Sequence, residues 1–243
     1  MQRIILIIAV ATTIVACATL ALAVSARSSS SPQPCGDTCA MPGMGSGMNS
    51  GSDDMGPHMR LTPLATIEPG DRERAAAIVA SLVPAIERFR DYRVAEQNGY
   101  VPFHPEIPMP VYHFTNSWNA IAAQFSFDPT RPTSLLYRRT ADGYVLIGAM
   151  YTAPRSATPA QLNARVPLSI ARWHEHVDFC IGPWGSTRAD YIGPNARFGL
   201  KGSIATAQAC AAAGGRFVPI VFGWMVHVYP FETDPADVWK VTM

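Results

Sequence analysis

SLLYRRTADGYVLIGAMYTA, residues 134–153, holds two apolar segments joined by a short polar turn. Its two halves, SLLYRR at 134–139 and YVLIGAMYTA at 144–153, read as extended segments. Between them, Thr140-Ala141-Asp142-Gly143 predicts a tight turn, in which Asp-Gly supplies the positive backbone angles that a short hairpin loop requires. The sequence therefore predicts an antiparallel hairpin here.

Two further segments predict additional strands around the hairpin. VYHF at 111–114 reads as extended, and VPIVFGWMVHVYPF at 218–231 is the most apolar stretch outside the N-terminal run. The second segment is too rich in valine and aromatic residues for a good helix, so we expect one central strand over 218–231.

Helices are predicted at the edges of these strands. Residues 71–99 have helical spacing, with Pro84 kinking or dividing the helix, and Thr158-Pro159 caps a second one. Shorter helices are expected at 203–213, before Gly214-Gly215, and after Asp234-Pro235. Together the pattern predicts an α+β fold, a mainly antiparallel sheet with flanking helices, as a single domain over residues 61–243.

Composition excludes two classes of protein. The chain has 243 residues, a net charge of +1 and 15% charged residues, which is too neutral to hold nucleic acid by charge. One apolar run is long enough for a membrane, which excludes a multi-span transporter. Contact with a membrane is therefore expected only through the N-terminal segment.

Residues 1–26 carry that apolar run, from Ile4 to Val24 after the basic Arg3. A cleaved signal peptide, an uncleaved anchor, or lipidation at Cys17 within Ile14-Val15-Ala16-Cys17 all fit it. Each alternative exports the rest of the chain, so we expect a periplasmic or outer-face protein, anchored or secreted.

Residues 27–60 are rich in Ser, Gly and Pro and predict a disordered tail. Thioethers and imidazoles are ligands that suit copper, and they are dense here. The candidate tail ligands are Met41, Met44, Met48, Met55, His58 and Met59. The alternatives are a plain linker and, for Cys35 and Cys39, a small disulfide loop.

Two cysteines lie in the predicted domain, Cys180 and Cys210. In an exported protein such a pair most often forms a disulfide, which is what we expect here.

The densest chemistry in the domain is Trp173-His174-Glu175-His176-Val177-Asp178-Phe179-Cys180. In a strand, alternation places His174, His176, Asp178 and Cys180 on one face, and an HxH pair offers two imidazoles to one metal. In a helix the two rings diverge. VDFC favours an extended form. The alternative role is a pair of histidines at a helix end that hydrogen-bond to the backbone and to Glu175 or Asp178.

His113 and His227 each lie in apolar company within a predicted strand. A lone histidine of this kind is most often a core residue, but three imidazoles from different strands make a common Zn or Cu set. We therefore expect a site of His174, His176 and His227, with His113 as a fourth ligand or supporting partner. His104, in FHPEIP, is expected at the surface.

Four segments resemble a set of uncharacterised exported bacterial proteins that share the motifs GYxPF, YH(F/Y)xN and DPxRPxxLLY before a late VHVY-like strand. The matching segments are NGYVPFHP (98–105), VYHFTN (111–116), FDPTRPTSLLYR (127–138) and DGYVLIGAMYTAP (142–154). The resemblance implies a shared fold and export, and that His113 and His227 belong to the common pattern. It implies no activity.

These observations predict an exported protein that binds a transition metal, copper first and zinc second, and acts in sequestration or delivery. One alternative is a metal-dependent hydrolase or oxidase in which Glu175 is the general base beside a metal-bound water. The other is a non-catalytic structural module whose histidines only fill a core.

Overall fold

The computed structural model describes residues 56–241. Its strands are β1 (Met59–Leu61), β2 (Tyr100–Pro102), β3 (Tyr112–Asn116), β4 (Ser134–Thr140), β5 (Gly143–Ala153), β6 (His174–Ile181), β7 (Arg216–Ile220) and β8 (Trp224–Val228). Its α-helices are α1 (Asp71–Ile86), α2 (Tyr92–Gln97), α3 (Ser117–Ala122), α4 (Pro159–Arg165) and α5 (Ala207–Ala212). Short 3₁₀ turns cover Glu87–Arg90, Arg188–Asp190 and Pro235–Asp237.

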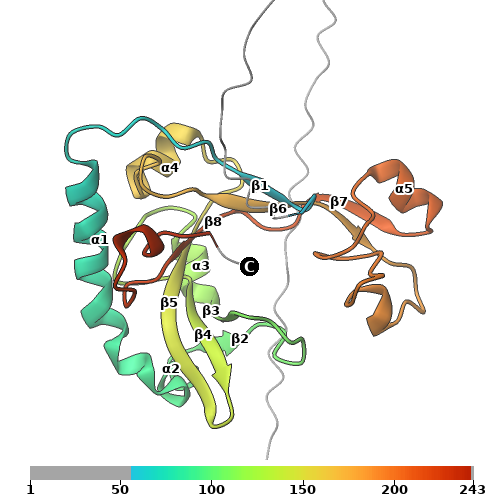
Figure 1. Ribbon diagram of the computed structural model, residues 1–243, viewed down its shortest axis with the longest axis horizontal. Coiled ribbons are helices and arrows are strands. Elements are labelled where there is room, and N and C mark those ends of the chain that lie inside the picture. Colours follow the sequence, from blue (N-terminus) through green and yellow to red (C-terminus); the bar gives the residue numbers. More distant parts are fainter. Residues whose placement is uncertain (1–55, 242–243) are drawn as a thin grey trace, which may run out of the picture. The chain divides into compact units, whose positions relative to one another are not determined.

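All strand pairings in this part of the chain are antiparallel, in the order β1-β6-β8-β5-β4-β3-β2, with β7 paired to β6 (Figure 1). The predicted α+β fold with a mainly antiparallel sheet is confirmed. The predicted signal or anchor over 1–26, Cys17, and the tail as far as residue 55 lie outside the described residues.

The predicted hairpin is β4–β5, in which Thr140 pairs with Gly143. Only part of the turn prediction holds, because Gly143 takes a positive φ of 130° while Asp142 does not. Ala141 and Asp142 form the two-residue loop, and glycine supplies the unusual backbone angle alone.

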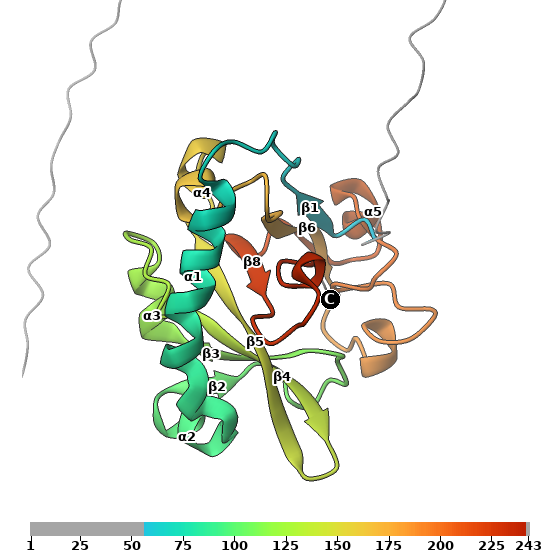
Figure 2. The ribbon, with the colours of Figure 1, turned by 60° about the vertical axis from the view of Figure 1, so that its left-hand side comes forward.

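One face of the sheet packs on α1. Ile78, Leu82 and Ile86 point from α1 into a core that includes Phe114 and Tyr137 of the sheet, and Figure 2 shows α1 running along this face. Pro84 lies inside α1, and the rest of the helical region predicted over 71–99 forms a 3₁₀ turn and then α2, which ends at Gln97. Helix α4 begins where predicted, with a capping box at Thr158 and proline at its first turn.

The segment 218–231 is not one strand, which corrects the prediction. It divides into the end of β7 and the whole of β8, separated by residues 221–223. At this break Gly223 passes the backbone so closely that a Cβ there would lie 2.3 Å from the carbonyl oxygen of Ala153. The break sends β7 to the outer part of β6 and leaves β8 between β6 and β5.

The folded region also begins earlier than residue 61, which corrects the predicted boundary. Met59–Leu61 form β1 and pair with His174–His176 of β6. His58 just before β1 is 1% exposed. Its Nε2 donates to the carbonyl of Gly202 at 2.8 Å, and its Nδ1 lies 3.3 Å from the carbonyl of Val177. His58 therefore belongs to the folded region, where its ring contacts the backbone of two distant segments, and not to the tail as predicted.

Candidate metal centre

The structure brings four histidines from three strands together on the face of the sheet that does not pack on α1. Ring centroids lie 4.9 Å apart for His174 and His227, 5.7 Å for His174 and His176, and 5.3 Å for His113 and His227. The predicted HxH pair is in strand β6, as the extended form requires. The ring of each of these four histidines thus lies within 5.7 Å of the ring of another, measured between centroids.

The distance between His113 and His227 matches a shared ion. Their Nε2 atoms lie 3.2 Å apart, close enough for one ring to donate a hydrogen bond to the other. Two nitrogens bound at 2.0 to 2.1 Å to one tetrahedral ion lie about 3.3 Å apart. The same separation is therefore compatible with a hydrogen bond between the two rings and with one metal ion bound by both.

The path of the sheet explains how these two residues meet. His113 lies on β3 and His227 on β8, with β4 and β5 between them. Three strand spacings span about 14 Å in a flat sheet, so the sheet must curl and the rings must lean toward each other. Gly148 of β5 permits the close packing, since a Cβ there would lie 2.3 Å from the carbonyl oxygen of Val228 and 3.1 Å from the ring of Tyr229.

Burial keeps three of these rings neutral. It lowers the pKa of His174 to about 3, and the pKa of His113 and of His176 to about 4. Repulsion from neighbouring histidines adds to the depression, through His176 on both His113 and His174, while a hydrogen bond with the backbone of His58 opposes it at His176. Neutral imidazole is the form that binds metals, so the cluster needs no deprotonation at neutral pH.

Two ring nitrogens in the cluster lack a hydrogen-bond partner. They are Nδ1 of His174 and Nδ1 of His176, both buried. A buried polar atom without a partner is costly, and an imidazole nitrogen in that position fits the role of a metal ligand. Within residues 56–241, no three His, Cys, Asp or Glu side chains already stand in a ligating arrangement. Ligation therefore requires the rings to turn about their side-chain bonds.

Glu175 does not share this face. It lies between the two histidines in β6, so alternation points it to the opposite side, where it is fully buried. One carboxylate oxygen pairs with Arg60, its partner across β1 and β6, and the other has no hydrogen-bond partner. The geometry therefore gives no support to Glu175 as a base beside a metal-bound water.

Beyond His176 the strand changes character. Asp178 has a φ of 55°, a left-handed backbone angle that is uncommon for a residue other than glycine. Cys180 forms a disulfide with Cys210, as predicted, with an S–S length of 1.99 Å and a Cα–Cα distance of 5.6 Å. The regular histidine face therefore does not continue to Asp178 and Cys180, and Cys180 is not a ligand.

His176 is the partly exposed member of the HxH pair. The ring of Phe222 is 6.2 Å from that of His176 and 6.0 Å from that of Phe103. Both phenylalanines are nearly half exposed, whereas His174 is 2% exposed. His104 lies at the surface, as expected, and pairs with Glu106 at 2.9 Å.

Of the predicted tail ligands, Met41, Met44, Met48 and Met55 lie outside the described residues, as do Cys35 and Cys39. Met59 lies in β1, directly opposite His176. Met150 and Met225 were not predicted as ligands, although Met225 stands two residues before His227 and so faces the same way in a strand.

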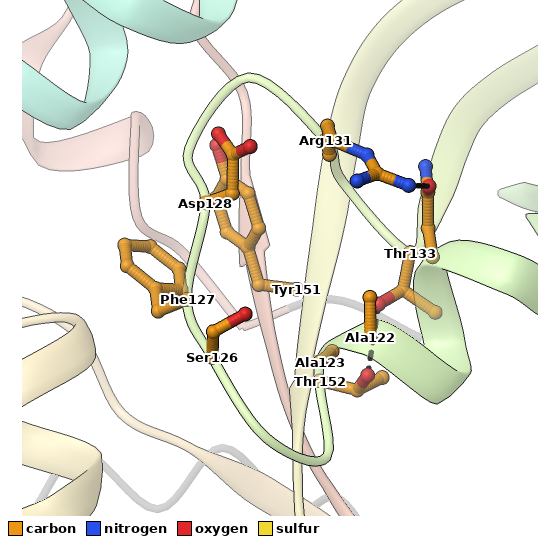
Figure 3. Close-up of a pocket in the computed structure, with 10 residues that line it drawn as sticks. Ala122, Ala123, Ser126, Phe127, Asp128, Arg131, Thr133, Tyr151 and Thr152 are labelled. Carbon is orange, nitrogen blue, oxygen red and sulfur yellow. Dashed lines mark hydrogen bonds between the residues drawn. The ribbon is translucent and has the colours of Figure 1, made fainter.

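A separate hollow lies between α3 and β5 (Figure 3). It has a volume of about 60 Å³ and is lined by Asp128, Arg131, Tyr151 and other residues. Since a water needs roughly 10 to 15 Å³ of such space, it has room for a few waters rather than an organic substrate. Arg131 is already engaged there, donating to the side-chain oxygen of Asn119 at 3.1 Å.

Comparison with known proteins leaves the geometry as the guide to function. No protein-family model, no curated protein and no solved structure matches the chain. In the part of the chain that the structure describes, the helices are too short or too polar to cross a bilayer.

Proposed function

We propose that this chain is an exported protein that binds a transition metal, copper in the first place and zinc as the alternative. The ion is held by His113, His174, His176 and His227, and its sequestration or delivery is the task of the protein. The observation that carries the proposal is the meeting of four imidazoles in a buried cluster, with two Nε2 atoms 3.2 Å apart.

Copper is the first choice because a site of several imidazoles binds Cu(II) more tightly than Zn(II) in the general order of divalent metals. The methionines of the predicted tail also favour copper, because thioethers are soft ligands that select Cu(I). Export is supported by the apolar run after Arg3 and by the Cys180–Cys210 disulfide, a bond typical of oxidising compartments. The resemblance to exported bacterial proteins agrees with this location.

The test is a metal titration of a full-length chain whose tail can no longer compete. In this tail-silenced chain Met41, Met44, Met48 and Met55 are replaced by Leu, and Cys17, Cys35 and Cys39 by Ser. We expect it to bind one Cu(II), and we expect His174→Ala and His227→Ala each to weaken the Kd at least about tenfold. The matched control is His104→Ala, because His104 is exposed and lies outside the cluster.

Electron paramagnetic resonance of the Cu(II) form adds a readout independent of affinity. Nitrogen hyperfine coupling from several imidazoles is expected in the tail-silenced chain and in His104→Ala. If the cluster variants bind copper as tightly as their parent and keep the same spectrum, the site does not exist, and the structural-module alternative is correct.

A further inference from the structure

The histidine face also carries most of the methionines of the described region. Residues 56–241 contain four methionines, Met59, Met109, Met150 and Met225. Three of these lie directly opposite a histidine of the cluster in the sheet register: Met59 opposite His176, Met225 opposite His174, and Met150 opposite His227. The fourth, Met109, packs against the core on the α1 side.

This register places thioethers beside imidazoles. Residues directly opposite in an antiparallel pair point to the same face, with Cβ atoms about 4.5 to 5.5 Å apart. The three pairs involve three different junctions, β1 with β6, β6 with β8, and β5 with β8. Methionine has three rotatable side-chain bonds, so its sulfur can swing toward a neighbour at this distance.

Packing supports the same assignment of faces. Met150 and Met225 are each 6% exposed and form a small core with Leu136 and Tyr229, separate from the large core under α1. On β8 the intervening Val226 belongs to that large core. Met59 at the edge strand is partly exposed. Met150 and Met225 are thus buried on the histidine face, and Met59 lies at the edge of that face.

We infer that Met59, Met150 and Met225 are thioether ligands that let the histidine site hold Cu(I) as well as Cu(II). Thioethers are soft donors that favour Cu(I), whereas imidazoles serve Cu(II) and Zn(II). A site with both donor types keeps its ion when the copper changes oxidation state. The inference rests on the proposed function, since it adds donors to the same site.

The competing explanation is that these methionines only fill space. Methionine to leucine separates the two, because it conserves volume and apolar character while removing the sulfur. The variants are Met59→Leu, Met150→Leu, Met225→Leu and the triple change, all in the tail-silenced full-length chain. Met109→Leu is the matched control, a methionine of the same domain on the other face.

The experiment measures three dissociation constants for each variant. Cu(I) is titrated anaerobically against a chromophoric Cu(I) chelator with ascorbate as reductant, and Cu(II) and Zn(II) are measured by competition. We expect the triple variant to lose at least about tenfold in Cu(I) affinity, with Cu(II) and Zn(II) affinities changed less than about threefold. Met109→Leu is expected to leave all three constants unchanged.

X-ray absorption at the copper edge keeps the test decisive if the triple variant folds poorly. The Cu(I) form of the tail-silenced parent should show sulfur scatterers beside nitrogen, and a shell of nitrogen alone overturns the inference. Unchanged Cu(I) affinity in the triple variant also overturns it, while Cu(II) binding by the histidines stands. An equal loss of affinity for all three ions overturns it as well, because such a loss reports a disturbed site rather than lost thioether ligands. If the histidine variants change no constant, the proposed function itself fails.

Discussion

The two faces of the sheet differ in what fills them. The face under α1 belongs to a large core of aliphatic and aromatic side chains, and its tyrosine hydroxyls find carbonyl partners, as Tyr137 does at Phe89 with 2.7 Å. The histidine face has only a small core of four residues, next to four imidazoles. The hydrophobic contribution to stability is therefore expected to come mainly from the first face, whereas the second buries imidazoles, whose loss of hydration opposes folding.

The sharpest way to test this division is acid, because it acts on three imidazoles at once. The folded-state pKa values of His113, His174 and His176 lie at about 4, 3 and 4, below the ordinary value of 6.5. Between these limits the unfolded chain binds more protons than the folded one, so the free energy of unfolding falls as the pH falls below 6.5. One unit of depression on each ring already amounts to about 4 kcal/mol.

This loss is measured by urea unfolding of the chelator-treated protein at pH 7, 6, 5 and 4. In the metal-bound protein the free energy of unfolding should begin to fall only at lower pH, because a bound ion competes with protons for the imidazoles. The exposed control His104→Ala should follow the profile of the parent. A free energy of unfolding that stays level from pH 7 to pH 4 contradicts the neutral, buried state of the cluster.

The second prediction concerns the α1 face alone. Leu82 is fully buried against the sheet, so Leu82→Ala should lower the free energy of unfolding by about 3 kcal/mol, within the usual range of 2 to 5. The Kd for Cu(II) of the folded fraction should not change. Denaturant unfolding and a metal titration on the same sample check both halves, and a weakened Kd would show that the two faces are coupled.

The third prediction, with the smallest expected change in the free energy of unfolding, concerns Gly148, where β5 and β8 pack closely. Gly148→Ala places a Cβ against the backbone of Val228, next to His227, and should cost about 2 kcal/mol, a typical penalty for overpacking. Unlike Leu82→Ala, it should also weaken Cu(II) binding, because it pushes β5 and β8 apart. Ala149→Gly at the neighbouring position is a control that loosens packing without this clash.

The sequence was sufficient for local features. Asp142-Gly143, Thr158-Pro159 and the apolar runs around them predicted the hairpin, the start of α4 and the α+β class, since each depends on neighbours in the chain. The disulfide followed from composition and the expected compartment. His174 and His176 were correctly expected on one face, because alternation along a strand is a local property.

What the sequence missed depends on contacts between distant segments. Gly223 reads as one glycine in an apolar run, and only its approach to Ala153 explains why 218–231 divides. His58 looks like part of a polar tail until Gly202 and Val177 provide its partners. Met150 and Met225 gain meaning from strand register, which no single segment determines.

The pairing of β1 with β6 has a consequence for how metal would reach the site. Met59 lies opposite His176, so the described part of the chain, which begins at Gly56, reaches the cluster within a few residues. Under the proposed function, a donor on the residues just before Gly56 would be tethered to the cluster by the chain itself, and a short tether sets a local concentration in the millimolar range. Transfer from such a donor to the histidines would then be an intramolecular step, whose rate does not depend on how dilute the protein is.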